Sequence, residues 1–316
     1  SALNGNAYNG EGRFVVAEAD ESDGSFLKLN SYLAVVTNIE DDHLDYYGTE
    51  ENIYKAFKQF LGNLVEGGKA ILCVDNAKVK ALAQEIDKAV ITYGLEEADY
   101  VAKDICYGVD GTTYKLYHKD EFVTEVRLIV PGRHNVLNSV GAFVAAREMG
   151  IADETILKAL EQFGGAKRRF ETKGKVNGVW VVDDYAHHPT EIEVTLKAAR
   201  QTQPKRLLCL FQPHRYTRTQ LLFKEFCNCF NDCDEVILTD IYAASELPIP
   251  GITSEALAEG ISKVTGKEVT YIAKLPKAEE YLEAKATAGD LILTVGAGDV
   301  FKVGEELVKE LERKNK

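Results

Sequence analysis

Apolar and polar positions along the first part of the chain predict strands and helices in turn. Short apolar runs at 13–18, 32–39, 69–74 and 90–93 indicate buried strands. Apolar residues at helical spacing between 50 and 64 indicate an amphipathic helix. Strands that alternate with helices are typical of an α/β protein with a parallel sheet.

The pattern changes between 99 and 130, where three segments alternate apolar and polar residues and are separated by turn residues. These segments predict a small antiparallel meander. Helical spacing returns at 135–150 and 153–163.

The pair Gly164-Gly165 marks the expected boundary between two domains, 1–164 and 165–316. Beyond it the alternation of strands and helices is cleaner. It predicts a Rossmann-like, doubly wound C-terminal domain with right-handed crossovers. The expected strands are 179–183, 206–211, 235–239, 268–272 and 291–295.

Composition narrows the class of partner. The 316 residues include 37 basic and 50 acidic side chains, a formal charge of −13, which repels nucleic-acid phosphates and anionic membranes. There is no apolar run of membrane-spanning length and no signal-peptide pattern. The six cysteines form no C-x-x-C pair, which favours reduced thiols in a cytoplasmic protein.

Two acidic clusters, Glu18–Asp23 and Glu40–Asp45, follow the first two expected strands. Ligands bind at the carboxyl ends of strands in open α/β sheets. Two adjacent acidic ends repel unless a cation lies between them, and oxygen ligands with one histidine suit Mg²⁺ or Mn²⁺. The alternative is a pair of solvated acidic loops that cap the next helices.

Two further clusters are suited to a nucleotide. In segment 131–138, His134, Asn135 and Asn138 open a helix; the amides either pair with a nucleobase edge or, in the case of Asn135, cap the helix. The basic triplet 167–169 at the domain boundary is either a phosphate clamp or a solvated turn.

Segments 183–191 and 211–219 follow strands of the second domain and are rich in histidine and arginine. Two arginines and a histidine on one loop predict a site for a carboxylate or phosphate. Thr190 is a candidate cap of the following helix. The turn 296–299 lacks the third glycine of a dinucleotide fingerprint, so we interpret it as a strand-to-helix turn capped by Asp299.

Taken together and in this order, these segments resemble the Mur ligase family, and the resemblance covers nearly the whole chain. The matching motifs are EADESDGSF (18–26), TNIEDDHLDYY (37–47), PGRHNVLN (131–138), GGAKRRFE (164–171), VDDYAHHPTE (182–191) and FQPHRYTRT (211–219). The resemblance implies that the first domain is a central ATPase domain and that the second closes over it.

The resemblance also implies the reaction. ATP phosphorylates a substrate carboxylate to an acyl phosphate, and an amino-acid amine then displaces phosphate. The form of the last two motifs points to UDP-N-acetylmuramate and L-alanine as substrates, in peptidoglycan synthesis, with ATP and Mg²⁺ as cofactors.

Residue roles carry over by position. The resemblance implies that Glu18 and His43 bind the metal ion and that Asp42 orients its neighbours. It implies that the ATP site contains His134, Asn135 and Asn138 beside adenine, Tyr185 near the base, Asp184 at the ribose and Arg169 at the phosphates. Those implied at the alanine carboxylate or the intermediate are His187, Arg215 and Arg218, with His214 adjacent.

One departure changes the expectation for this chain. The family's Gly-Lys-Thr phosphate loop and its N-terminal UDP-binding domain have no counterpart in the sequence. We therefore expect the chain to be part of a longer protein and to be nearly inactive alone. Because a sheet edge would be exposed, we also expect either a homodimer or aggregation, or a perturbed first domain.

Three alternatives remain open at this point. One is a Mur ligase that recycles murein tripeptide. Another is a non-catalytic substrate-binding module. The third, a Mg²⁺-dependent phosphatase, leaves the histidine- and arginine-rich loops unexplained.

Overall fold

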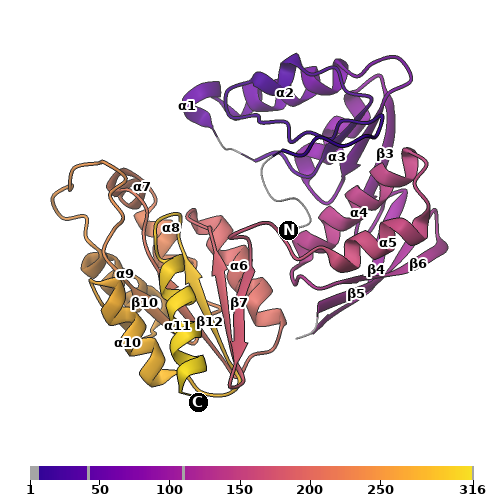
Figure 1. Ribbon diagram of the computed structural model, residues 1–316. Coiled ribbons are helices and arrows are strands. Elements are labelled where there is room, and N and C mark those ends of the chain that lie inside the picture. Colours follow the sequence, from indigo (N-terminus) through magenta and orange to yellow (C-terminus); the bar gives the residue numbers. More distant parts are fainter. Residues whose placement is uncertain (1–6, 41–42, 109–110, 315–316) are drawn as a thin grey trace.

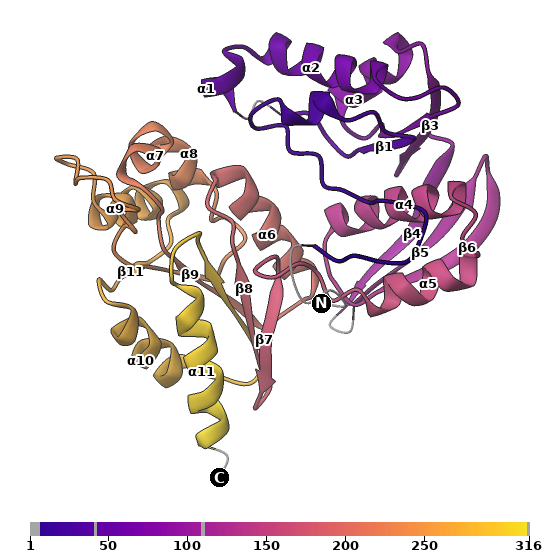
Figure 2. The same cartoon turned by 45° about the horizontal axis from the view of Figure 1, so that its top comes forward.

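The computed structural model describes residues 7–40, 43–108 and 111–314 and consists of two α/β halves that lie side by side (Figures 1 and 2). The first half contains a mixed six-stranded sheet with the order β1-β2-β3-β4-β5-β6. Its strands are β1 (Leu33–Val36), β2 (Lys69–Cys73), β3 (Ala89–Gly94), β4 (Tyr100–Gly108), β5 (Gly111–His118) and β6 (Glu121–Leu128).

The first four strands are parallel, and β4, β5 and β6 form the predicted antiparallel meander. The helical elements of this half are η1 (Ser25–Lys28), α1 (Leu44–Tyr47), α2 (Glu50–Gly62), α3 (Ala77–Glu85), α4 (Arg133–Glu148) and α5 (Asp153–Gln162).

Strand β2 shows why this sheet is covered on both faces. Ala70 and Leu72 pack into one core with α2 and α3, whereas Ile71 and Cys73 pack into a second core with α4. Because successive side chains of a strand point to opposite faces, an uninterrupted apolar run is buried only between two layers of helices.

The second half contains a six-stranded sheet with the order β11-β10-β9-β12-β8-β7. Its strands are β7 (Glu171–Val176), β8 (Val179–Asp184), β9 (Arg206–Phe211), β10 (Glu235–Leu238), β11 (Val269–Tyr271) and β12 (Asp290–Val295). All neighbours are parallel except β7 and β8. The α/β class and the Rossmann-like character of this sheet are confirmed.

Helices cover both faces of the second sheet: α6, α8 and α9 share one core with β9, and α10 and α11 share the other. The helices are α6 (Pro189–Gln201), α7 (Tyr216–Leu221), α8 (Phe223–Asn228), α9 (Ser254–Thr265), α10 (Leu275–Lys285) and α11 (Phe301–Arg313). Within the described part of the chain, no helix is both long and apolar enough to cross a membrane.

One predicted strand is absent from the structure, and one observed strand was not predicted. Residues 13–18 are not a strand; Val15 and Val16 are 94% and 88% exposed, because none of the described strands pairs with this segment. Strand β7 was not predicted, because its polar, lysine-rich sequence resembles a loop. It forms as the exposed antiparallel edge of the second sheet.

Candidate functional site

The carboxyl ends of β8 and β9 bring the two histidine-rich segments together. Both strands pair with β12, so the loop that follows β8 and the loop that follows β9 emerge at the same edge of the sheet. The ring centroids of His187 and His214 lie 6.0 Å apart. The sequence prediction that these segments share one site is therefore supported by the structure.

His187 is fixed by its own loop and by the first turn of α6. Its Nδ1 lies 3.0 Å from the backbone oxygen of Tyr185 and 3.6 Å from the Glu191 carboxylate. Burial lowers the pKa of His187, and nearby Arg218 and Arg169 lower it further, whereas Tyr185 and Glu191 act to raise it. The neutral imidazole is thus favoured at physiological pH.

His214 is fixed by contacts on two sides. Arg218, one turn later, has its Nη1 3.1 Å from His214 Nδ1. The ring of Tyr242 stacks on the His214 ring at 5.5 Å between centroids and an interplanar angle of 10°. Burial lowers the pKa of His214 to about 4, with further contributions from Arg218, His187 and Arg215.

The segment after β10 joins this site, although the sequence analysis missed it. The backbone N–H of Arg215 donates to the Tyr242 carbonyl oxygen, and Tyr242 N–H donates to the oxygen of Pro213. Glu246 accepts hydrogen bonds from the backbone and the hydroxyl of Thr217. The signal was the position of this segment after the third predicted strand of the domain, where ligands of parallel sheets also bind.

The two arginines of the basic triplet 167–169 differ in burial: Arg168 is largely buried and Arg169 is about half exposed. Arg168 donates to the buried Asp183 carboxylate at 2.9 Å and to the backbone oxygens of Gly296 and Gly298. Its guanidinium also lies over the Tyr185 ring. The prediction of a three-residue phosphate clamp is therefore wrong for Arg168, because its hydrogen bonds hold strands β8 and β12 to the boundary turn.

Arg169 is more exposed than Arg168 and pairs with a carboxylate at the start of α6. Its side chain is about half exposed, and its Nη1 lies 3.5 Å from the Glu191 carboxylate. Asp184 is different: it is buried, and its carboxylate accepts the backbone N–H groups of Phe170 and Ala186, both at 2.8 Å. Burial raises the pKa of Asp184. Its predicted contact with a ribose stays a prediction.

The predicted adenine side lies at the start of α4, where the two halves approach each other. His134 is partly buried, and its pKa is lowered by burial and by the charge of Arg169. A Cβ atom on Gly132, which has a φ of 104°, would lie 3.1 Å from the Ala198 side chain of α6. The structure thus brings the start of α4, where His134 lies, against α6 of the second half.

Three sequence interpretations of helix ends are corrected. Asn135 does not cap α4; it lies in the first turn, where its side-chain amide donates to Pro131. Thr190 does not cap α6, because His188 is the N-cap and accepts the Thr190 N–H. Asp299 does not cap α11; it accepts a hydrogen bond from the Gln212 amide.

In the described part of the two acidic clusters, Glu21, Glu40 and His43 come together. His43 Nε2 is 3.6 Å from Glu21, and both line a cavity of about 80 Å³ together with Glu40. Glu18 is exposed and outside any described strand. Asp42, which was expected to orient its neighbours, lies outside the described residues. Among the described side chains, no group of three His, Cys, Asp or Glu is arranged to hold a metal ion.

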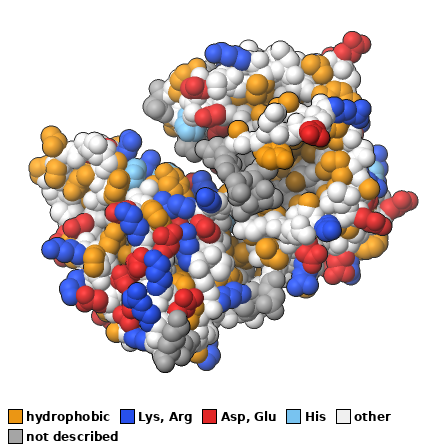
Figure 3. All heavy atoms as spheres, in the orientation of Figure 1, with side chains coloured by type: hydrophobic (Ala, Val, Ile, Leu, Met, Phe, Trp, Pro, Cys, Tyr) orange, Lys and Arg blue, Asp and Glu red, His pale blue; other side chains and the backbone are white. Residues whose placement is uncertain are grey.

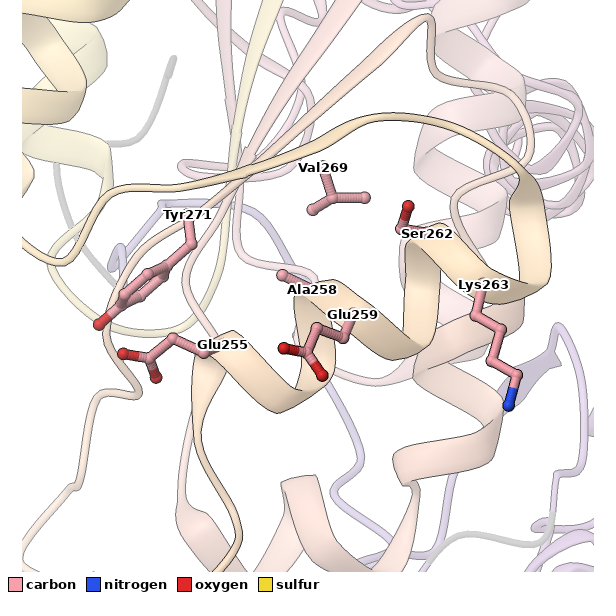
Figure 4. Close-up of a pocket in the computed structure, with 7 residues that line it drawn as sticks. All are labelled: Glu255, Ala258, Glu259, Ser262, Lys263, Val269 and Tyr271. Atoms are coloured by element: carbon pink, nitrogen blue, oxygen red, sulfur yellow. The ribbon is translucent and has the colours of Figure 1, made fainter.

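Other surface features do not coincide with the site. A cavity of about 530 Å³ between α9 and β11 is lined by residues of which none belongs to the predicted site (Figure 4). Lys, Arg, Asp and Glu are interspersed over the C-terminal half instead of forming one basic face (Figure 3). The same view shows a hollow in the surface between the two halves.

The fold defines a class of protein with two α/β halves that face a shared hollow. Models of two families match the chain, "Mur ligase middle domain" over residues 4–146 and "Mur ligase, glutamate ligase domain" over residues 168–298. The second description is the name of a domain family and does not identify the amino acid used here.

Curated relatives give the closer relationship. A UDP-N-acetylmuramate–L-alanine ligase of Desulforamulus reducens is 50% identical over 99% of this chain and 68% of its own length. One of Pelotomaculum thermopropionicum is 46% identical over the whole chain and 69% of its own length. The chain therefore belongs to the Mur ligase family, whose members are ATP-dependent ligases, and it spans about two thirds of these relatives.

Solved structures of Mur ligases share the fold of this chain. The crystal structure of a UDP-N-acetylmuramate–alanine ligase from Thermotoga maritima superimposes with a TM-score of 0.78 at 25% identity, over 94% of this chain and 63% of that one. A MurF ligase of the same organism in complex with ADP shares the fold, with a TM-score of 0.72 at 21% identity, over 92% and 65% of the respective chains.

Proposed function

We propose that the protein joins L-alanine to UDP-N-acetylmuramate at the expense of ATP, through an acyl phosphate, in peptidoglycan synthesis. The observation that carries this proposal is the cluster of His187, His214, Arg215 and Arg218, which lies at the ends of β8 and β9, the two strands that flank β12, in a chain 50% identical to an alanine-adding ligase. Arginines near neutral imidazoles suit a small amino acid, whose carboxylate needs a cation and whose amine needs a proton acceptor.

ATP is expected to bind between the halves. Arg169 is the exposed cation that would contact its phosphates, and His134, Asn135 and Asn138 lie at the start of α4 for the base. The proximity of His134 to Arg169 supports a single nucleotide site spanning both halves. Tyr185 is 37% exposed and lies beside Arg169, which supports a role for its ring near the base.

Magnesium is proposed for this reaction because it neutralises repulsion between a carboxylate and a triphosphate. We assign Glu18 and His43 to it by family position. The described side chains do not form a coordination shell by themselves. The assignment predicts that Glu18→Gln and His43→Gln raise the Mg²⁺ concentration needed for half-maximal ADP release.

The setting proposed for the enzyme is the cytoplasm, where ATP and nucleotide-linked sugars occur. Its six cysteines are free thiols, as is usual in a reducing compartment. We also propose that the family's phosphate loop and UDP-binding domain belong to a longer gene product, and that self-association occurs through the open edge of the first sheet.

The test is ADP release by the complete gene product with ATP, Mg²⁺, UDP-N-acetylmuramate and L-alanine. Release that requires both substrates supports the proposal, and Arg218→Ala should abolish it while Lys197→Ala, in an exposed pair on α6, should not. Faster turnover with murein tripeptide than with L-alanine would favour the recycling ligase instead. Binding of the nucleotide sugar without any ADP release would favour a non-catalytic module.

A further inference from the structure

The two site histidines hold their protons on opposite nitrogens. A carbonyl oxygen only accepts hydrogen bonds, so the His187 Nδ1 that lies 3.0 Å from the Tyr185 oxygen carries the proton. The Glu191 carboxylate, 3.6 Å from the same nitrogen, favours the same placement. The Nε2 atom of neutral His187 therefore has a free lone pair.

The reverse holds for His214. A guanidinium only donates hydrogen bonds, so the His214 Nδ1 that lies 3.1 Å from Arg218 Nη1 accepts one. Neutral His214 consequently carries its proton on Nε2. Among the hydrogen bonds described for this chain, neither Nε2 atom has a partner.

We propose that the two rings divide the work on the bound amino acid: His187 Nε2 accepts a proton from its amine, and His214 Nε2–H donates a hydrogen bond to its carboxylate. This catalytic use rests on the proposed function, whereas the positions of the protons do not. A centroid separation of 6.0 Å places both rings within reach of one small ligand.

The proton balance follows from the chemistry of an acyl phosphate. The ammonium of the amino acid gives one proton to His187 Nε2, and its nitrogen lone pair then bonds to the acyl carbon. The bond from that carbon to the phosphate oxygen breaks, and its electron pair leaves with phosphate. The second amine proton leaves with the departing phosphate as the tetrahedral intermediate collapses.

The charges around both rings fit this division. Arg218 and Arg169 face His187, and Arg218 and Arg215 face His214, so an imidazolium is disfavoured before the reaction. The same cations favour loss of the proton from a bound ammonium. After transfer, the Tyr185 oxygen and the Glu191 carboxylate, both beside His187, stabilise the new imidazolium.

Tyr242 is assigned as a positioning residue for His214. One face of its ring stacks on His214, and a Cβ atom added to Gly298 would lie only 2.8 Å from its Cγ. The ring is therefore held between the histidine and the turn that follows β12. Arg168 also holds this turn, because its guanidinium donates a hydrogen bond to the Gly298 backbone oxygen.

The protons are located by two-bond ¹H–¹⁵N NMR on the full chain with ¹⁵N-labelled histidine, because protonated and lone-pair nitrogens resonate in distinct ranges. His187→Asn and His214→Gln assign the signals by removing one pattern each. At neutral pH we expect the Nδ1–H form for His187 and the Nε2–H form for His214. The same tautomer for both rings, or an imidazolium for either, would overturn the proposal.

Matched variants test the roles by kinetics in the complete gene product. His187→Asn keeps a donor for the Tyr185 oxygen but loses the lone pair, so kcat should fall at least about 100-fold and lose its rise with pH. His214→Asn should raise KM for L-alanine about tenfold or more, whereas His214→Gln, whose amide reaches the Nε2 position, should restore most of it.

An unchanged pH profile in His187→Asn, or equal KM values for the two His214 variants, would contradict the assigned roles. Failure of the proposed function looks different. In that case the wild-type enzyme shows no ligation of L-alanine, while the NMR spectra still show the two opposed tautomers.

Discussion

Arg168 shows how a residue in a functional motif can serve the fold. Its guanidinium is mostly buried and pairs with Asp183, whose side chain is completely buried. It also bonds two backbone oxygens of the turn after β12. The residue itself has a φ of 58°, a left-handed conformation that these contacts hold in place.

Replacing Arg168 with methionine should lower the free energy of unfolding by about 3–5 kcal/mol, because the Asp183 carboxylate is left buried without its cation. Urea unfolding at neutral pH measures the loss. Lys197→Ala, which breaks an exposed pair with Glu193, is the control and should change stability by no more than about 1 kcal/mol. Equal effects for the two variants would contradict the structural role of Arg168.

His214 makes stability depend on pH in a defined direction. Its folded pKa of about 4 lies below the ordinary value of 6.5, so the unfolded chain takes up a proton that the folded chain does not. Stability should therefore fall as pH drops from 6.5 towards 4. In His214→Gln this part of the pH dependence should disappear, as measured by urea unfolding at pH 7 and pH 5; an identical slope in the variant would refute the assignment.

At the scale of elements, the start of α6 links stability to the site. Glu191 accepts hydrogen bonds from the backbone N–H groups of His187 and His188, and His188 accepts one from Thr190, which completes a capping box. One carboxylate thus closes the end of the helix and supports the ring of His187.

Glu191→Ala should destabilise the C-terminal domain by about 1–2 kcal/mol, the usual range for loss of a cap. It should also weaken the preference of His187 for a proton on Nδ1. The matched control is Glu193→Ala on the same helix, which loses only an exposed pair. Thermal unfolding followed by circular dichroism compares them, and a smaller loss in Glu191→Ala than in Glu193→Ala would show that the box is not formed.

Sequence patterns predicted the buried strands well and the edges poorly. The strand at 206–211 is confirmed to the residue. A continuous apolar run between turn residues is stable as a strand of a parallel sheet, where both of its faces are buried. Strand β7 was missed and the segment 13–18 was wrongly predicted as a strand, because pairing at an edge depends on neighbours that local sequence does not specify.

The same limit applies to the site. The segments that hold His187, His214, Arg215 and Arg218 were singled out by composition and strand-end position, and the family resemblance implied that they share one site. The structure brings the two segments together. Tyr242 and Glu246 were missed, because their role comes from the packing of a third strand end against the first two. The tautomers of the rings likewise depend on atom contacts that no sequence pattern contains.

At the scale of the whole molecule, the terminal strand of the first described sheet is where we expect copies of the chain to meet. Within the described sheet, β1 is a terminal strand that pairs only with β2, and its Val35 is 42% exposed. The apolar side chains of Val15 and Val16 are almost fully exposed. Unpaired backbone groups and exposed apolar side chains together favour association between chains.

We therefore expect this chain to self-associate as its concentration rises, and the double variant Val15→Lys/Val16→Lys to do so less, because like charges repel at the contact. Sedimentation velocity over a range of concentrations measures the effect. Val264→Lys, at an exposed position on α9 in the other half, is the control and should sediment as the wild type does. A wild-type chain that stays monomeric at every concentration would rule out association through this edge, and an equal effect of Val264→Lys would place the contact elsewhere.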